Sequence, residues 1–303
     1  MARRRSRRGR ATRVGCGVLA FVVVLGGATT AVVSVLRMHD AAPPLAQRCS
    51  ATVDGTSWYL DPEQADNAAL VAAVALRRGL PARAVTIGLA TALQESRLVN
   101  IDYGDRDSLG LFQQRPSQGW GTPEQVLDPV YSTGRFYDGL VQVAGYTELP
   151  VTEAAQAVQR SGFPDAYAQH EGRARAYASA LTGFSPAALS CRLHDAEPGS
   201  VGADAVGARV LRDLGELPVT PATDADGRPT VLVDTAPLAA ADPAGAGRVA
   251  WAVAQWAVAV ASPLGLTRVE AGGQVWEREG DAWTAATAAD APVDGVVRLT
   301  LAG

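Results

Sequence analysis

The sequence predicts a mainly α-helical domain that is preceded by a single N-terminal transmembrane helix and followed by a small α/β domain. Three observations support this prediction. Residues 14–36 carry no charge, residues 49–191 show helical spacing of apolar residues nearly throughout, and most strand-like segments come after residue 228. A length of 303 residues is enough for about two domains.

The N-terminal segment has the composition of a signal-anchor. Residues 1–13 contain seven arginines and no acidic residue, and the 23 uncharged residues 14–36 follow directly. Such a run can cross the roughly 30 Å hydrocarbon core as one helix, and the positive-inside rule places the basic tail in the cytoplasm. We therefore predict a single-pass protein of the cell membrane whose domains lie outside, after a stalk at residues 37–48. A cleaved signal peptide, with a small-residue site near residues 28–30, is the alternative.

Charge and cysteine content limit the classes of partner and cofactor that we expect for this protein. The formal net charge is −4 although residues 1–13 are strongly basic, so the rest of the chain is acidic. This argues against nucleic-acid binding, which needs a basic face. With Cys16 inside the apolar run, Cys49 and Cys191 remain, and in an oxidising compartment they predict a disulfide. Two unpaired buried thiols are the alternative. The three histidines show no metal-ligand spacing, so we expect neither a metal nor another cofactor.

A series of helices is predicted between these two cysteines. Asp61 is a candidate N-cap, and Pro62 fits the first position of a helix that runs to about Arg78. Gly79 ends this helix, and the next one covers residues 81–98. Further helices are expected from residue 128, at residues 152–159 and at residues 165–181. Residues 49–195 therefore form the predicted α domain.

Glu95 lies in the last turn of the second helix. The apolar stripe of that helix contains Val85, Leu89 and Ala92, and Glu95 lies about 90° from it, at the border of the core. Partial burial and the negative end of the helix dipole both disfavour the anion, so they raise the pKa of the carboxyl. A raised pKa suits a general acid near neutral pH. The alternative is a surface glutamate beside Arg97.

The residues that follow resemble a known family. Glu95-Ser96, with Gly110-Leu111-Phe112-Gln113 after it, is similar to the Glu-Ser … Gly-Leu-Met-Gln signature of soluble lytic transglycosylases and goose-type lysozyme-like proteins. Gly110 stands 15 and Gln113 stands 18 residues after the glutamate, as in that family. The resemblance covers about residues 60–180 and implies a lysozyme-like domain that acts on the β-1,4 glycan strands of peptidoglycan. It implies that Glu95 is the catalytic acid/base, which protonates the glycosidic oxygen and then takes a proton from the sugar's C6 hydroxyl or from water.

The resemblance also implies the residues that would bind the glycan. Ser108, Gly110 and Gln113 match positions that line the cleft. The family's third motif, Ala-Tyr-Asn-Ala-Gly, has a loose counterpart at residues 157–161, where Gln159 replaces the asparagine.

Aromatic and acidic side chains extend the candidate site beyond that match. Tyr103 and Trp120 are candidates for stacking on sugar faces, whereas Phe112 fits the core better. A conventional glycosidase needs a second carboxylate, and Asp102, Asp105 or Asp107 could supply it. The alternative is that these aspartates cap turns.

The C-terminal third predicts a different kind of structure. Residues 196–228 are a linker with one helix, and residues 229–303 form a small α/β domain with one buried helix on an antiparallel or mixed sheet. Its predicted elements are a strand at 230–233, a helix at 248–261, a hairpin at 266–278 across Gly272-Gly273, and a strand at 296–301. We find no nucleophile, metal or phosphate motif there, so its role as a wall-binding, partner-binding or structural module stays open.

The sequence as a whole predicts a membrane-anchored, extracytoplasmic enzyme that cleaves peptidoglycan, either a lytic transglycosylase or a lysozyme-type glycosidase. Its expected partners are glycan strands and, through one helix, the membrane. The alternative is a non-catalytic lysozyme-like module that binds glycan or a partner in a cell-wall complex, and the loose third motif favours this alternative.

Overall fold

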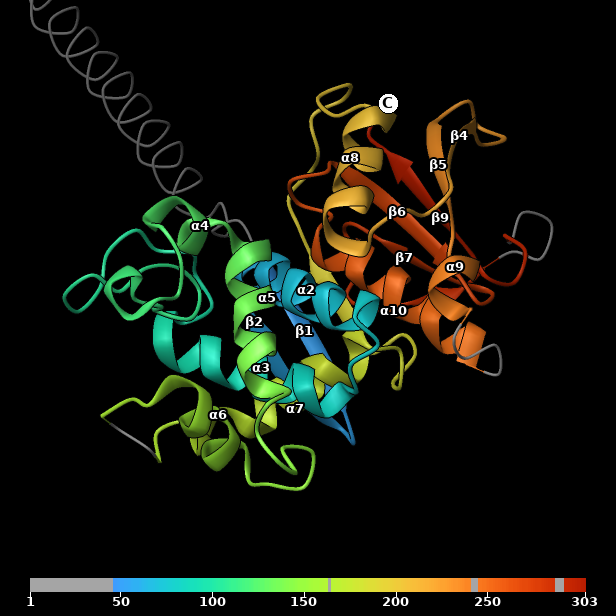
Figure 1. Ribbon diagram of the computed structural model, residues 1–303. Coiled ribbons are helices and arrows are strands. Elements are labelled where there is room, and N and C mark those ends of the chain that lie inside the picture. The colour runs from blue at the N-terminus through green and yellow to red at the C-terminus, as the bar shows by residue number, and fades with distance from the viewer. Residues whose placement is uncertain (1–45, 163–164, 241–244, 287–291) are drawn as a thin grey trace, which may run out of the picture. The chain divides into compact units, whose positions relative to one another are not determined.

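The computed structural model describes residues 46–162, 165–240, 245–286 and 292–303 (Figure 1). The predicted basic tail, the predicted membrane span at 14–36 and most of the predicted stalk lie outside these residues. Residues 47–303 form one compact unit.

A three-stranded antiparallel sheet lies at the start of this unit. Its strands are β1 (Arg48–Val53), β2 (Thr56–Leu60) and β3 (Leu189–Arg192), in the order β2-β1-β3. Asp54 and Gly55 both have positive φ angles, 50° and 74°, which form the tight turn between β1 and β2. Cys49 lies directly opposite Cys191 in the register of β1 and β3, and the two are joined by a disulfide. The predicted disulfide is therefore confirmed.

Helices pack around one central helix in the first half of the unit. The longer ones are α2 (Pro62–Arg77), α3 (Ala82–Ser96), α5 (Pro129–Leu140), α6 (Val151–Gln159) and α7 (Glu171–Leu181). Three shorter ones, α4 (Pro123–Leu127), η1 (Pro116–Gln118) and η2 (Ala168–His170), connect them. α3 contacts α2, α5, α6 and α7, so its side chains from Ala84 to Leu93 are buried all round and not only along one stripe.

These helices begin where the sequence predicts. Asp61 caps α2 in a capping box with Gln64, and Pro62 occupies the first helical position. Asp128 caps α5 through its side chain, which accepts hydrogen bonds from the Val130 and Tyr131 amides. The predicted helix at 165–181 is shorter than expected, because regular α7 begins only at Glu171.

The second half is built on a six-stranded antiparallel sheet with the order β4-β5-β9-β6-β7-β8. The strands are β4 (Val219–Thr223), β5 (Pro229–Asp234), β6 (Leu266–Ala271), β7 (Gln274–Glu277), β8 (Thr284–Ala285) and β9 (Val296–Leu301). The helices of this half are α8 (Ala203–Leu214), α9 (Ala236–Ala239) and α10 (Ala246–Ala259).

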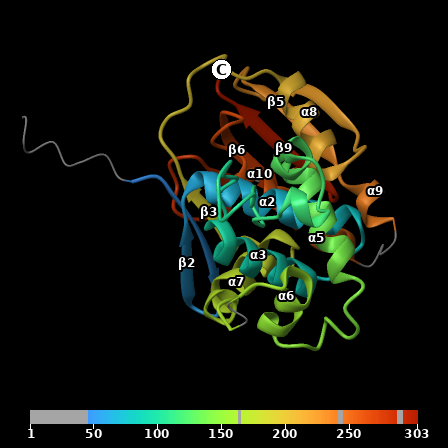
Figure 2. The same cartoon turned by 60° about the vertical axis from the view of Figure 1, so that its left-hand side comes forward.

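α10 joins the two halves. It packs on β6 and β9 of the larger sheet and also contacts α2, α7 and β3, as Figure 2 shows. Its Gln255 side chain is fully buried: the amide oxygen accepts from the Ala188 and Leu189 N–H groups, and the amide nitrogen donates to the Ala180 and Ser185 carbonyls. A helix that is apolar on nearly every side is expected when it is covered on two faces.

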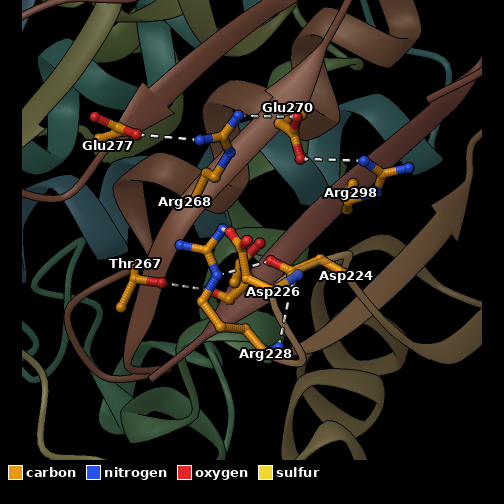
Figure 3. A network of polar contacts seen from close by, with 9 residues as sticks. Asp224, Asp226, Arg228, Thr267, Arg268, Glu270, Glu277 and Arg298 are labelled. Carbon is orange, nitrogen blue, oxygen red and sulfur yellow. Dashed lines mark hydrogen bonds and ion pairs between the residues drawn. The ribbon is translucent and has the colours of Figure 1, made fainter. Parts of the chain in front are cut away.

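The outer face of the larger sheet is polar, because side chains alternate between the two faces of each strand. The buried Glu270 carboxylate on β6 pairs with Arg268 on the same strand and with Arg298 on β9 (Figure 3). Arg268 also pairs with Glu277 on β7. Beside them, Arg228 pairs with the loop carboxylates of Asp224 and Asp226 (Figure 3).

The predicted fold class is wrong. The described chain is an α+β protein with two antiparallel sheets of three and six strands, and not a mainly α domain followed by a small α/β domain. The predictions omitted β1, β2 and β3, whose partners are far apart in sequence or joined by a turn that was not recognised. They also omitted β4, which lies at the edge of the larger sheet.

The prediction of a single-pass membrane protein is corrected as well. Within the described ranges, no helix is long and apolar enough to cross a bilayer. The longest, α2, has 16 residues, which is about 24 Å at 1.5 Å per residue and short of the hydrocarbon core.

Candidate functional site

The end of α3 places Glu95 where the helix stops and the chain turns sharply. Arg97 and Leu98 both have left-handed backbone angles, with φ of 57° and 63°, and the Leu98 side chain is buried. The Ser96 hydroxyl donates a hydrogen bond to the Leu111 carbonyl at 2.8 Å. This bond fixes the segment around Gly110 against the last turn of the helix. The two parts of the family signature, 15 residues apart in the sequence, are therefore in direct contact.

Tyr167 and Gln159 flank the Glu95 carboxyl. The Tyr167 hydroxyl donates to Glu95 Oε1 at 2.7 Å. Burial raises the pKa of the Glu95 carboxyl above its ordinary value, and hydrogen bonds from Tyr167 and Gln159 oppose this shift without cancelling it. The predicted border position of Glu95 thus agrees with its half-buried place in the structure.

Tyr167 itself is fully buried. Burial raises the pKa of its hydroxyl well above the ordinary value for tyrosine, so the group stays protonated and remains a donor to Glu95. The sequence does not predict this contact. The two residues are 72 positions apart, and no local spacing rule connects them.

Gln159 connects Glu95 to a hollow in the surface. Its Nε2 donates to the Phe112 carbonyl at 2.7 Å, which leaves its Oε1 as a buried acceptor without a partner among the described residues. Gln159 also lines a cavity of about 560 Å³, whose lining does not include Glu95. The residues that line it come from the loop before α4, from α5 and the turn after it, and from the end of α6: Gln118, Gly119, Trp120, Arg135, Asp138, Gly139, Gln142, Val143, Ala157, Val158, Gln159 and Arg160. The structure therefore places Trp120 and Gln159 at the same hollow.

The segment from Ser108 to Gln114 forms a tight turn against the helix. Leu109 and Gln114 exchange two backbone hydrogen bonds of 3.0 Å. Gly110 has a φ of 75°, and a Cβ at this position would lie 2.6 Å from the Val126 carbonyl oxygen. Only glycine fits such a site. The conformation of the turn accounts for Gly110, and the Ser108 side chain is buried beside it.

Gln113 holds the loop that precedes this turn. Its Nε2 lies 3.3 Å from both the Tyr103 and the Gly110 carbonyl oxygens, to which it donates. Tyr103 is 70% exposed, so its ring is free to meet a ligand. Phe112, in contrast, is buried and stacks on Phe136 with ring centroids 4.6 Å apart, which confirms that it belongs to the core.

The three loop aspartates have different surroundings. Asp107 accepts a hydrogen bond from the Ser117 amide at 2.7 Å and pairs with Arg115 at 2.8 Å. These bonds hold the pKa of Asp107 well below its usual range. Asp102 and Asp105 are exposed, and the Asp105 carboxylate lies 3.9 Å from the Arg106 guanidinium. Among the described residues, none of the three hydrogen-bonds to Glu95.

The surroundings of Glu95 are those that a proton-donating carboxyl requires. Within the parts of the chain that the structure describes, no group of three or more His, Cys, Asp or Glu residues is placed to hold a metal ion. Glu95 is the half-buried carboxyl that has a protonated phenol on one side and an amide that borders a cavity on the other.

Comparison with known proteins does not assign this chain to a family. No protein-family model matches the chain. A search of curated proteins likewise finds no significant match. The resemblance to lytic transglycosylases therefore stays a prediction that rests on the residues of the two signature segments.

Proposed function

We propose that this protein cleaves the β-1,4 glycan strands of peptidoglycan, with Glu95 as general acid/base. One observation supports this most strongly: a half-buried carboxyl of raised pKa ends α3 and meets a tyrosine hydroxyl at 2.7 Å. A lone surface glutamate has neither a raised pKa nor a buried phenol partner. The hydrogen bond from Ser96 to the Leu111 carbonyl adds support, because it holds the segment around Gly110 against the last turn of α3, next to Glu95 in the sequence.

The proposed chemistry uses the same carboxyl twice. Protonated Glu95 gives its proton to the glycosidic oxygen as the bond from the anomeric carbon breaks. The resulting carboxylate is stabilised by the Tyr167 hydroxyl, which is already placed to donate to it. The carboxylate then takes a proton either from the sugar's own C6 hydroxyl, whose oxygen closes a 1,6-anhydro ring, or from a water that attacks the anomeric carbon.

A hydrolytic route can use a second carboxylate. Asp107 already pairs with Arg115 and accepts a hydrogen bond from the Ser117 amide, so Asp102 and Asp105 are the remaining candidates in this loop.

The two routes leave different products, so product analysis separates them. Mass spectrometry of the muropeptides released by the full chain identifies the route. A 1,6-anhydro end indicates attack by the C6 hydroxyl, and a reducing end indicates hydrolysis.

The test of the proposal is Glu95→Gln in the full chain. The variant keeps the size of the side chain and its hydrogen-bonding capacity but cannot transfer the proton, so muropeptide release is expected to fall by about 10²–10⁴-fold. Glu148→Gln is the matched control, because Glu148 lies exposed in the loop before α6 and is not among the residues that line the cavity at Gln159. Both variants should keep the far-UV circular dichroism of the wild type. Full activity in Glu95→Gln would exclude Glu95 as the acid.

A non-catalytic glycan-binding module is the second candidate. The observation that favours it is the commitment of the Gln159 amide to the Phe112 carbonyl, at the position where the resembling family has an asparagine. In this case the wild type and Glu95→Gln would bind insoluble peptidoglycan equally, and neither would release any product. Co-sedimentation measured together with product release distinguishes the two candidates.

A further inference from the structure

The outer face of the three-stranded sheet carries mostly polar side chains. Cys49 and Ala51 on β1 are buried toward the helices, so the alternate residues of each strand point the other way. Those side chains, together with Asp281, line a hollow of about 190 Å³: Arg48, Ser50, Thr52, Ser57, Tyr59, Ser190, Arg192 and Asp281. This hollow lies outside the candidate glycan site, with which it shares no lining residue.

The strand register places two arginines directly opposite each other on this face. Arg48 on β1 is the partner of Arg192 on β3, and Ser50 is the partner of Ser190 in the next row. Like charges directly opposite each other across two strands are destabilising. Asp281 pairs with Arg192, which offsets one of the two charges.

Arg48 has no carboxylate partner in the described part of the chain. Its guanidinium lies over the Tyr59 ring, 5.0 Å from the centroid. Two arginines and one aspartate leave a local charge of +1 on a protein whose formal net charge is −4. On the larger sheet, by comparison, Arg228, Arg268 and Arg298 each pair with carboxylates (Figure 3).

Two buried polar atoms on this face also have no partner. Ser190 is only 7% exposed, and its Oγ makes no hydrogen bond within the described residues. The Nε of Arg192 is likewise without an acceptor there. A buried donor left without a partner costs free energy, and an acceptor group placed in the hollow would satisfy both.

We propose that this face binds an oxyanion of the phosphate class between Arg48 and Arg192. The two guanidinium groups neutralise the ion and remove their mutual repulsion, and the Ser50 and Ser190 hydroxyls donate to its oxygens. Arginine suits this role because its fixed fork of N–H donors matches the oxygens of phosphate or carboxylate groups. A hollow of about 190 Å³ has the volume of roughly six waters at ~30 Å³ each, which is enough for one such group.

The proposal is tested by titrating inorganic phosphate into the full chain at constant ionic strength, with binding followed by NMR shifts or by melting temperature. Saturable binding is expected for the wild type. Arg48→Gln should weaken it by about tenfold, as loss of one charge-assisted hydrogen bond would, and Ser190→Ala should weaken it without any change in charge. Arg175→Gln is the matched control, since Arg175 is exposed on α7 and outside the hollow.

The stability of Arg48→Gln without phosphate gives a second readout. The substitution removes one of two facing like charges, so in phosphate-free buffer of low ionic strength its melting temperature should equal or exceed that of the wild type. A lower value would show that Arg48 stabilises the fold in the absence of an anion and would contradict the proposal. Absence of saturable binding, or equal binding by wild type and both variants, would overturn it.

Acetate, titrated in parallel, separates the two sources of an oxyanion. Phosphate is expected to bind more tightly than acetate, and both Arg48→Gln and Ser190→Ala should weaken its binding. Tighter binding of acetate would show that the site selects a carboxylate and would contradict the phosphate class. Activity on peptidoglycan should be unchanged in these variants, so the test is independent of the proposed role of Glu95.

Discussion

The position of Glu95 in its helix depends on the local sequence, whereas its hydrogen bonding depends on residues far away in the chain. Its place in the last turn of a helix and its angle from the apolar stripe follow from the sequence alone. Its hydrogen bond from Tyr167 does not, because that hydroxyl comes from the turn before η2. Burial and the flanking donors act in opposite directions on the pKa, and burial is the larger effect.

Tyr167→Phe tests that balance. The substitution keeps the buried ring but removes the hydrogen bond that stabilises the Glu95 carboxylate, so the pKa of Glu95 should rise further. Because the first step needs the protonated acid, activity falls as pH rises through this pKa. The alkaline limb of the kcat/KM profile should therefore move to higher pH in the variant.

The matched control for this experiment is Tyr177→Phe. Tyr177 is also buried, but its hydroxyl faces the Cys49 and Trp58 carbonyls and not the site. This variant is expected to lose stability and to leave the alkaline limb in place. A limb that does not move in Tyr167→Phe, or that moves to lower pH, would contradict the role assigned to the hydroxyl.

At the scale of elements, the helices with N-caps were predictable, whereas the first sheet was predictable only in part. Caps at Asp61 and Asp128 mark the starts of α2 and α5, so local chemistry defines them. The hairpin of β1 and β2 carried a signal that was overlooked, the Asp54-Gly55 turn. β3 carried none, because a strand of four residues pairs with β1 from more than 130 positions away.

Gln255→Met tests the coupling of α10 to the rest of the fold. The apolar side chain fills a similar volume but leaves the Ala188 and Leu189 N–H groups buried without their acceptor. We expect the free energy of unfolding to fall by about 2–6 kcal/mol, from roughly 1–3 kcal/mol for each of the two unsatisfied N–H groups. Urea denaturation measures this loss. Gln274→Met on β7, where the side chain is half-exposed, should change the stability by less than about 0.5 kcal/mol.

At the scale of the whole molecule, the two halves share buried polar contacts. The indole N–H of Trp276 donates to the Cys191 carbonyl at 3.1 Å, and that of Trp283 donates to the Leu189 carbonyl at 2.8 Å. Trp256 on α10 donates to the buried Asp213 carboxylate, which also pairs with Arg209. Arg209 in turn pairs with Asp66 on α2. β3, an edge strand of the first sheet, thus pairs with β1 and also accepts hydrogen bonds from two indoles of the second half.

Removal of residues 196–303 tests whether the predicted domain at 49–195 can fold alone. The truncated chain would expose the face of α2 and β3 that α10 covers, and it would leave the Leu189 and Cys191 carbonyls without their indole donors. We expect it to lose the near-UV circular dichroism and the cooperative thermal transition of the full chain. A sharp transition in the truncated chain would show instead that the first half is an independent domain.

The sequence by itself determined the capped starts of α2 and α5, the disulfide partners and the place of Glu95 at the end of a helix, because caps, periodicity and cysteine number are local or countable features. Only the tertiary structure decided the α+β class, the union of the two halves through α10, and the meeting of Glu95 with Tyr167 and of Arg48 with Arg192. The physical reason is the same in each case. Strand pairing and buried hydrogen bonds join residues far apart in the chain, and their partners are selected by packing, which no local pattern records.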